Sequence, residues 1–545
     1  MPLRSPLKNS SVRAIGGMDL TDVLFLFFSL AIAATQLLLI GNNLTYPDGI
    51  AYLDVGEMYF FGGSHHPINA YWSFLYSFIL GFIQKWARPP IDFEFWTISA
   101  FNFFTLVMTA IVFVFLMRVL IQWWRGLFPA TEKFCFYTKL FGYFLFAWTT
   151  FKATPVDLPT PDLLVSFFVY LAVLLLLWIA SGRKSIFWPI LLGIVLGFGF
   201  LTKPIMLFIT AAFTIIFLLD RQFSFFKRVI RVAILLLVFS SVLFPYVYSI
   251  SKQSGKFSMG TTGAANYAWF VGGAHKIPII HEKLLSKPCN VFEFQVPPTV
   301  KRRVTFPWHY DPSWQNPTVT FNLRKQLGAL ARNCQFLSSY FFFPYSLPIL
   351  SLVFFVPAGF LVKRLRSVLP IFLLSAAGTL PYLFLLVEGR YMAPFAALFY
   401  IGIFLLLAQM DTASQKKAFL AAMAVFIFLT TASLSKNWVK LFLPRADQQL
   451  QTDTAKKIQE MGIEPGSKVA YCGKNIYLQY WARLARVEIA AQIYPCANPK
   501  VNDSVLNVMR SKNIRIIVSN RRVPALGEQA PETSGQTKQY WIYTV

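Results

Sequence analysis

The stretch that decides the fold runs from Asp22 to Gly63. It reads DVLFLFFSLAIAATQLLLIG over residues 22–41 and NNLTYPDGIAYLDVGEMYFFGG over residues 42–63. The first part is long and apolar enough to cross a bilayer as one helix. The second part carries three carboxylates, Asp48, Asp54 and Glu57, among aromatic residues and glycines. This order predicts a spanning helix that delivers acidic side chains to the membrane surface.

The same apolar pattern recurs through most of the chain. Of the 545 residues, 56% are hydrophobic and only 14% are charged. A soluble domain could not bury so much apolar surface. We therefore predict an all-α polytopic membrane protein with about eleven spans. The predicted spans are 22–41, 96–120, 134–150, 162–180, 186–201, 204–219, 232–250, 345–362, 368–386, 392–410 and 418–435.

The basic residues give the orientation. The net charge of +26 suits nucleic acid at first sight, but lysines and arginines cluster at the ends of apolar segments, as membrane topology requires. If the segment 68–84 is an amphipathic helix at the outer interface, almost every short basic loop falls on one side. If that segment spans the membrane, the later loops change sides and the basic residues no longer gather on one face. We therefore expect the N-terminus inside, and no nucleic-acid partner.

This orientation divides the chain into three parts. Residues 1–21 form a cytoplasmic tail before an uncleaved anchor, and residues 22–435 form the transmembrane domain. That domain includes the outer loop 42–95, with interfacial helices, and the large basic outer loop 251–344. Residues 436–545 resemble a small periplasmic α/β domain, because SKVAYCG, IRIIVSN and QYWIYTV suit strands. NIYLQYWARL and VNDSVLNVMRSK suit helices.

The cysteines fall into two pairs, one in each predicted outer region. Cys289 and Cys334 share the long loop, and Cys472 and Cys496 share the C-terminal domain. Such pairs suit disulfides in an oxidising compartment, and unpaired buried thiols are the alternative. The basic residues of the loop, including Arg302, suit anionic lipid headgroups, a phosphate-bearing substrate or a solvated face.

Four short motifs on the predicted outer face resemble a known class. They are Asp48-Gly-Ile-Ala-Tyr52, Pro161-Asp162, Leu201-Thr-Lys203 and Arg390-Tyr391-Met-Ala-Pro394. In this order and on one face, they resemble the GT-C integral membrane glycosyltransferases, such as protein O-mannosyltransferases and lipid A aminoarabinose transferases. The resemblance covers residues 20–435. Many relatives place Glu after the first Asp, where this chain has Gly49, so the roles of Asp54 and Glu57 stay open.

The resemblance implies transfer of a sugar from a polyprenyl-phosphate carrier, on the outer face of a bacterial cytoplasmic membrane, to a glycan, lipid or protein acceptor. It assigns Asp48 as general base, with Asp54, Glu57 and Asp162 as further catalytic candidates. Lys203, Arg390, Arg302 and Arg303 are then candidates for stabilising the departing phosphate. Asp157 and Asp162 are candidates either to bind a divalent ion, Mg²⁺ or Mn²⁺, or to orient the acceptor. The C-terminal domain would help present the acceptor.

Each residue has a simpler interpretation. Pro-Asp-Gly at Asp48 is a strong turn signature. Asp54 and Glu57 can be solvated, Asp162 can be a helix-terminal carboxylate, and Lys203 can reach the interface with its long side chain. Arg390 can pair only with Glu388. Two other functions also fit a polytopic protein: a transporter or flippase for a lipid-linked saccharide, and a non-catalytic assembly protein.

Overall fold

The structure is a computed structural model of the chain. It describes residues 17–39, 46–61, 68–128, 132–181, 185–273, 282–286, 291–294, 305, 321–352, 358–407, 413–442, 450–473, 476–493, 503–520, 535–536 and 540–545.

Most of the described chain forms a bundle of long helices. Its members are α1 (Leu20–Leu39), α4 (Glu94–Leu127), α5 (Glu132–Ala153), α6 (Asp162–Ala180), α7 (Phe187–Thr202), α8 (Met206–Leu219), α9 (Phe225–Ser254), α13 (Ala358–Leu383), α14 (Gly389–Leu407) and α15 (Ala413–Phe442). Shorter helices are α2 (Pro47–Phe61), α3 (Phe74–Ala87), α10 (Thr262–Phe270), α11 (Leu323–Leu337) and α12 (Leu347–Leu350). Seven of the described helices are long and apolar enough to cross a membrane, and the apolar helices α7 and α8 are shorter. The predicted fold class, an all-α polytopic membrane protein, is confirmed.

The helices agree with the predicted spans in all but one region. Every predicted span except 345–362 coincides with a helix. In that region α12 covers only Leu347–Leu350, and Ala358 already begins α13, which continues through the basic residues that were expected to form a loop. The segment 68–84 does contain a short helix, α3, but this helix begins only at Phe74.

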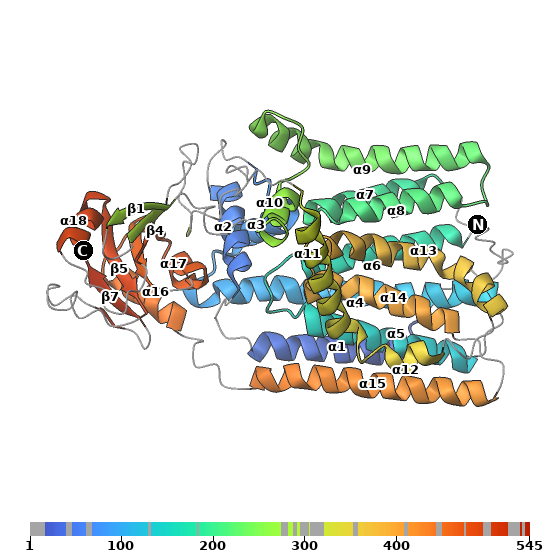
Figure 1. Ribbon diagram of the computed structural model, residues 1–545. Helices are drawn as coiled ribbons and strands as arrows, with labels where there is room; N and C mark the ends of the chain where they lie inside the picture. The colour runs from blue at the N-terminus through green and yellow to red at the C-terminus, as the bar shows by residue number, and fades with distance from the viewer. Residues whose placement is uncertain are drawn as a thin grey trace.

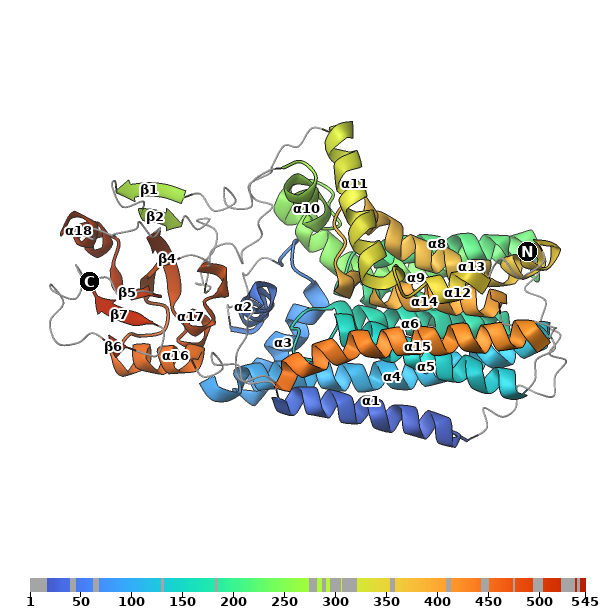
Figure 2. The same cartoon turned by 60° about the horizontal axis from the view of Figure 1, so that its bottom comes forward.

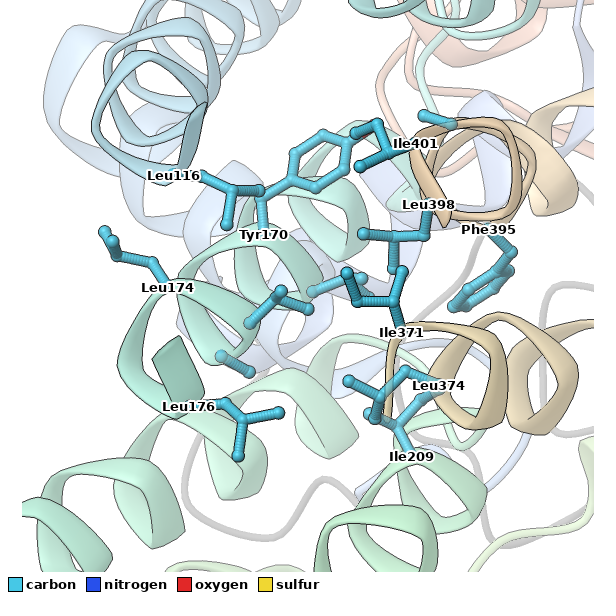
Figure 3. Close-up of a cluster of buried hydrophobic side chains, with 14 of the residues drawn as sticks. Leu116, Tyr170, Leu174, Leu176, Ile209, Ile371, Leu374, Phe395, Leu398 and Ile401 are labelled. Carbon is cyan, nitrogen blue, oxygen red and sulfur yellow. The ribbon is translucent and has the colours of Figure 1, made fainter. Parts of the chain in front are cut away.

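The core of the bundle lies where five helices meet. Figure 3 shows side chains of α4, α6, α8, α13 and α14 converging, with Tyr170 of α6 directed toward Ile401 of α14. Leu116 and Leu374 belong to the same cluster and are almost fully buried. Large apolar side chains on the outside of the bundle, such as Phe27 and Phe428, are exposed, as expected of surfaces that face lipid.

The C-terminal region forms an α/β domain around one sheet. Its strands are β3 (Lys468–Cys472), β4 (Glu488–Ile493), β5 (Ile514–Ser519), β6 (Gly535–Gln536) and β7 (Trp541–Thr544), with helices α16 (Leu450–Glu460), α17 (Tyr480–Leu484) and α18 (Asp503–Ser511). β3 lies between β4 and β5 and is parallel to both. The strands expected in SKVAYCG, IRIIVSN and QYWIYTV are therefore present. So are the two expected helices, the first of them shortened to α17.

The long loop 251–344 adds two strands to this sheet. β1 (Glu282–Ser286) pairs with β2 (Val291–Phe294), and β2 pairs antiparallel with β4, giving the order β1-β2-β4-β3-β5-β7-β6. The extramembrane domain is thus built from two segments of the chain. Cys334 lies on α11 and Cys472 in β3, whereas Cys289 and Cys496 lie outside the described residues. Cys334 carries a free, exposed thiol, so its predicted pairing with Cys289 is not seen, whereas the pairing of Cys472 with Cys496 stays a prediction.

The sheet domain lies at one end of the helix bundle, and the first described residues lie at the other end (Figures 1 and 2). We call the end of the bundle that faces the sheet the domain end. The helices α2, α3 and α10 lie at the domain end in both views. They therefore occupy the space between the spanning helices and the sheet domain.

Candidate active site

Four charged residues that the sequence singled out meet at the domain end. Asp48 lies in the first turn of α2, directly after Pro47, and Asp162 is the first residue of α6. Lys203 follows the last residue of α7 in an extended conformation, which the next residue, Pro204, favours. Arg390 is the second residue of α14. All four positions are helix ends, so neighbouring helices deliver their side chains to one place.

Asp162 joins the two cations of this group. Its Oδ1 lies 2.5 Å from Nζ of Lys203, and its Oδ2 lies 3.6 Å from Nε of Arg390. Its side chain is only 2% exposed. The N-terminus of α6 also favours a negative charge at this position. The interpretation as a helix-terminal carboxylate is therefore correct but incomplete, because Asp162 also orients two basic side chains.

Arg390 connects Asp162 to Asp48. Its Nη2 lies 3.1 Å from Oδ2 of Asp48, and its Nε donates to Oε2 of Glu388 at 2.6 Å. Pairing with Glu388 is thus one of three carboxylate contacts rather than the whole role of the arginine. Asp48 is 26% exposed, against 2% for Asp162, and is therefore the accessible carboxylate of the pair.

Aromatic rings surround the cations. Nζ of Lys203 lies 3.5 Å from the ring centre of Tyr391, and the ring of Tyr382 stacks on Tyr391 at 4.8 Å. The guanidinium of Arg390 lies 4.7 Å from the ring centre of Tyr46. Such contacts stabilise partly desolvated cations. Burial lowers the pKa of Lys203 and the charge of Asp162 opposes that shift, while burial and the charge of Asp48 raise the pKa of Tyr46.

The four charged residues line a cavity of about 180 Å³. Its remaining walls are mostly aromatic or small and polar, including Tyr52, Tyr71, Trp72, Thr262, Asn266 and Tyr382. A cavity with an accessible carboxylate, two fixed cations and aromatic walls suits a polar substrate that carries negative charge. It can also exchange a proton with that substrate at Asp48.

Sequence reasoning missed the polar wall of this cavity. Tyr71 donates a hydrogen bond through its hydroxyl to Oδ1 of Asn266 at 3.0 Å, and Thr262 donates to the carbonyl of Tyr71 at 2.6 Å. Thr262 and Asn266 belong to α10, in the long loop. There the basic residues drew attention, and the stretch GTTGAANY carries no motif that marks it as a cavity wall.

Several predicted site residues lie elsewhere. Asp54 and Glu57 contact Arg483 of the sheet domain, at 2.9 and 2.5 Å, on a part of α2 beyond the cavity. Asp157 is not among the described residues that line the cavity. Arg302 and Arg303 lie outside the described residues, so their phosphate contacts stay predictions.

The contacts of Asp162 do not by themselves form a metal site. Its Oδ1 pairs with Lys203, whereas its Oδ2 is buried without a hydrogen-bond partner among the described residues and lies 3.6 Å from Nε of Arg390, so the metal hypothesis stays a prediction. Within the part of the chain that the structure describes, no three His, Cys, Asp or Glu side chains form a cluster that could hold a metal ion.

A second, apolar cavity of about 450 Å³ lies along α13 and α14, two helices that also contribute residues to the first cavity. Its lining begins at Leu380 of α13 and Met392 of α14, within one turn of Tyr382 and Arg390. The remaining lining residues are almost all apolar, among them Leu369, Phe372, Phe395, Ala396 and Phe399. An apolar chain whose polar head occupies the charged cavity would find a matching surface here.

The fold and the site together define a polytopic membrane protein with a charged, aromatic-walled cavity at the domain end. No protein-family model and no curated protein matches the sequence. The fold is similar to that of an oligosaccharyltransferase from Archaeoglobus fulgidus, in complex with zinc and sulfate, with a TM-score of 0.48, 13% identity, and coverage of 91% of this chain and 68% of that chain.

A further structure of AglB from Archaeoglobus fulgidus, in complex with an inhibitory peptide and a dolichol-phosphate, gives a TM-score of 0.45, 11% identity, and coverage of 92% and 69%. The comparison with ArnT from Cupriavidus metallidurans, bound to undecaprenyl phosphate, gives a TM-score of 0.40 and 12% identity. It covers 96% of this chain and 97% of that chain. These values define no family for the chain. The functional proposal therefore rests on the residues of the site.

Proposed function

We propose that the protein is a GT-C-type glycosyltransferase of a bacterial cytoplasmic membrane. It would transfer a sugar from a polyprenyl-phosphate carrier to a glycan, lipid or protein acceptor at the outer face. The observation that carries the proposal is the convergence of Asp48, Lys203 and Arg390 on one cavity at the domain end. The distribution of basic residues among the short loops supports the outer location.

Each charged group has a role in this reaction. The acceptor oxygen forms a bond to the anomeric carbon of the sugar while the bond from that carbon to the carrier phosphate breaks. Asp48 takes the proton of the acceptor hydroxyl, which is otherwise a poor nucleophile. A single displacement of this kind inverts the anomeric carbon. The polyprenyl phosphate leaves with its electron pair and with increased negative charge.

Lys203 and Arg390 stabilise that leaving phosphate. Both are largely buried, so their charges act in a partly dry site, where fixed cations stabilise developing charge more strongly than in water. Asp162 keeps them in place between turnovers through its contacts at 2.5 and 3.6 Å. The apolar cavity along α13 and α14 offers a surface for the first isoprene units of the carrier.

The test is a transfer assay with the purified protein in lipid nanodiscs and a panel of polyprenyl-phosphate sugars. Asp48→Asn removes the base and should lower the rate about 10²- to 10⁴-fold, while binding of polyprenyl phosphate persists. Asp453→Asn, at an exposed carboxylate of the sheet domain, is the matched control and should keep full activity.

Two results would contradict the proposal. Full activity in a folded Asp48→Asn variant would remove Asp48 as the base. If the wild type transfers no sugar from any donor but moves a lipid-linked saccharide across the bilayer, the protein is a transporter and not a transferase.

A further inference from the structure

A second charged cluster lies on the same helix as Asp48, at the boundary between the bundle and the sheet domain. Arg483 of α17 reaches Oδ1 of Asp54 at 2.9 Å and Oε2 of Glu57 at 2.5 Å, both on α2. The same guanidinium lies 3.2 Å from Oε1 of Glu94 on α4 and donates to Gln84 of α3. One side chain of the sheet domain therefore contacts three helices at the domain end.

These contacts are buried. The side chains of Arg483, Asp54 and Glu94 are 4%, 1% and 2% exposed. Asp54 also accepts hydrogen bonds from the backbone N–H and the hydroxyl of Thr305, in the long loop. Breaking a buried ion pair by removing one partner leaves an uncompensated charge and is strongly unfavourable. This cluster therefore fixes geometry far more firmly than an exposed ion pair does.

The charge of Arg483 is permanent. Burial on its own would lower the pKa of its guanidinium, but the carboxylates of Glu57, Glu94 and Asp54 together raise that pKa above its usual range. Neighbouring Arg486 contributes a second cation, because it contacts both Glu57 and Glu94. We call Arg483 with Asp54, Glu57 and Glu94 the clamp, and the guanidinium at its centre keeps its positive charge over the whole range in which an ordinary arginine does.

The geometry of α2 connects the clamp to the cavity. Asp48 precedes Asp54 by six residues, which is about 9 Å along a helix that rises 1.5 Å per residue. Between them, Tyr52 packs against Trp72 and Tyr76. Because a helix of this length moves as a unit, a shift at Asp54 and Glu57 displaces the first turn and its carboxylate.

We propose that Arg483 is a positioning residue for Asp48, so that the sheet domain sets the place of the general base through helix α2. The interpretation of Asp48 as the base rests on the proposed function, whereas the mechanical coupling does not. Asp54 and Glu57, which the sequence suggested as catalytic helpers, take the role of anchor points in this proposal.

The test uses Arg483→Lys, which keeps the charge but loses the planar fork that reaches α2 and α4 together. The full-length variant in nanodiscs should lose on the order of tenfold to a hundredfold in kcat, because a small misplacement of a reacting group is costly. The Kd for polyprenyl phosphate should stay within about twofold of the wild-type value, because Lys203 and Arg390 lie on other helices.

The matched control is Lys456→Gln. Lys456 of α16 also bridges the sheet domain to the bundle, at 2.8 Å from Asp92, but this pair is half exposed and does not touch α2. Exposed pairs contribute little to stability. This variant should therefore keep the wild-type kcat. Equal losses in both variants would show that any weakening of the domain contact reduces activity, and would overturn the specific role of Arg483.

Hydrogen–deuterium exchange separates failure of this inference from failure of the proposed function. Arg483→Lys should speed exchange of α2 amides around Asp48 and leave α6 and α14 unchanged, whether or not a sugar donor has been found. Unchanged exchange in α2 would overturn the inference, and so would a parallel loss of kcat and of polyprenyl phosphate binding.

Discussion

At the scale of residues, environment separates two chemically identical carboxylates. Asp162 is buried between Lys203 and Arg390, with one oxygen paired to each of these cations. Asp48 shares one contact with Arg390 and keeps a quarter of its side chain exposed to the cavity. In the proposed reaction, we therefore assign the orientation of the cations to Asp162 and proton transfer to Asp48.

Lys203 makes the site sensitive to alkaline pH. Because burial lowers the pKa of this amine, it loses its proton at a lower pH than an ordinary lysine does. The transfer rate should then fall as the pH rises through the lowered pKa. Lys203→Arg, whose guanidinium stays protonated, should move this alkaline limb to higher pH in a rate profile.

The lowered pKa of Lys203 affects folding stability and transfer rate in opposite directions as the pH rises. With a lowered pKa in the folded state, the unfolded chain binds more protons at this group, so the contribution of Lys203 to folding stability improves as pH rises. The alkaline loss of rate should therefore occur without a matching fall in the thermal midpoint. Identical alkaline limbs in wild type and variant would mean that another group titrates.

Removal of divalent metal ions tests the contacts of Asp162 directly. Because Lys203 and Arg390 face both of its oxygens, transfer by the purified protein should persist in excess EDTA. The measurement is the transfer rate with and without chelator, followed by addition of Mg²⁺ or Mn²⁺. A loss that either ion restores would support the metal hypothesis drawn from Asp157 and Asp162.

The charged residues of the site could be predicted from sequence because each stands where an apolar segment ends. Asp48, Asp162, Lys203 and Arg390 are ionisable groups beside predicted spans, and such positions favour function. Asn266 could not be found in this way. Its contact with Tyr71 joins positions 195 residues apart, and neither residue breaks a periodic pattern.

At the scale of elements, the crossing of α2 and α3 is the tightest contact near the site. Gly56 and Gly81 face each other so closely that a Cβ atom on either residue would collide with the backbone of the other helix. Their lack of a side chain is therefore what permits this approach. The position of α2, and with it Asp48, depends on two residues that the sequence analysis did not single out.

Gly81→Ala should disturb this crossing. The added methyl group meets backbone atoms of Gly56, which cannot rotate away, so we expect a loss of about 1–3 kcal/mol in stability. The thermal aggregation midpoint in detergent should fall, and the transfer rate should fall with it because α2 is displaced. Gly142→Ala is the matched control, since the three atoms nearest to its Cβ all belong to the flexible side chain of Met117. Equal midpoints in the two variants would contradict the tight crossing.

Helices and strands could be predicted from the sequence where apolar residues follow a clear pattern. Long apolar runs predicted α6, α7 and α8 to within two residues of their observed bounds, whereas α4 continues seven residues beyond its predicted end. The region 345–362 was wrong as a single span, because apolar composition does not distinguish one helix from a short helix followed by the start of the next. The strands β1 and β2 lie in the long loop, which the sequence analysis interpreted by its excess of basic residues. No periodic pattern in that loop indicated that it pairs with β4.

At the scale of the whole molecule, the candidate active site and the features that position it lie at one end. The cavity, the Arg483 clamp and the sheet domain all lie at the domain end, and the sheet joins a loop inside the transmembrane region to the C-terminal segment. Contacts between Arg483 and Asp54 bridge 429 residues of sequence. Such contacts depend on the assembled fold, which explains why the sequence suggested catalytic roles for Asp54 and Glu57.

The orientation of the domain end decides from which side of the membrane the cavity receives its substrates. Ser254, at the end of α9, lies toward the domain end, whereas Ser185, just before α7, lies toward the opposite end, and both are exposed. In a background without other cysteines, Ser254→Cys should react with an impermeant maleimide in intact spheroplasts. Ser185→Cys should react only after the membrane is permeabilised, because the short loops at its end carry most of the basic residues. Reaction of both cysteines from the same side would refute the topology, and the reverse pattern would move the cavity, and any lipid-linked donor, to the cytoplasmic face.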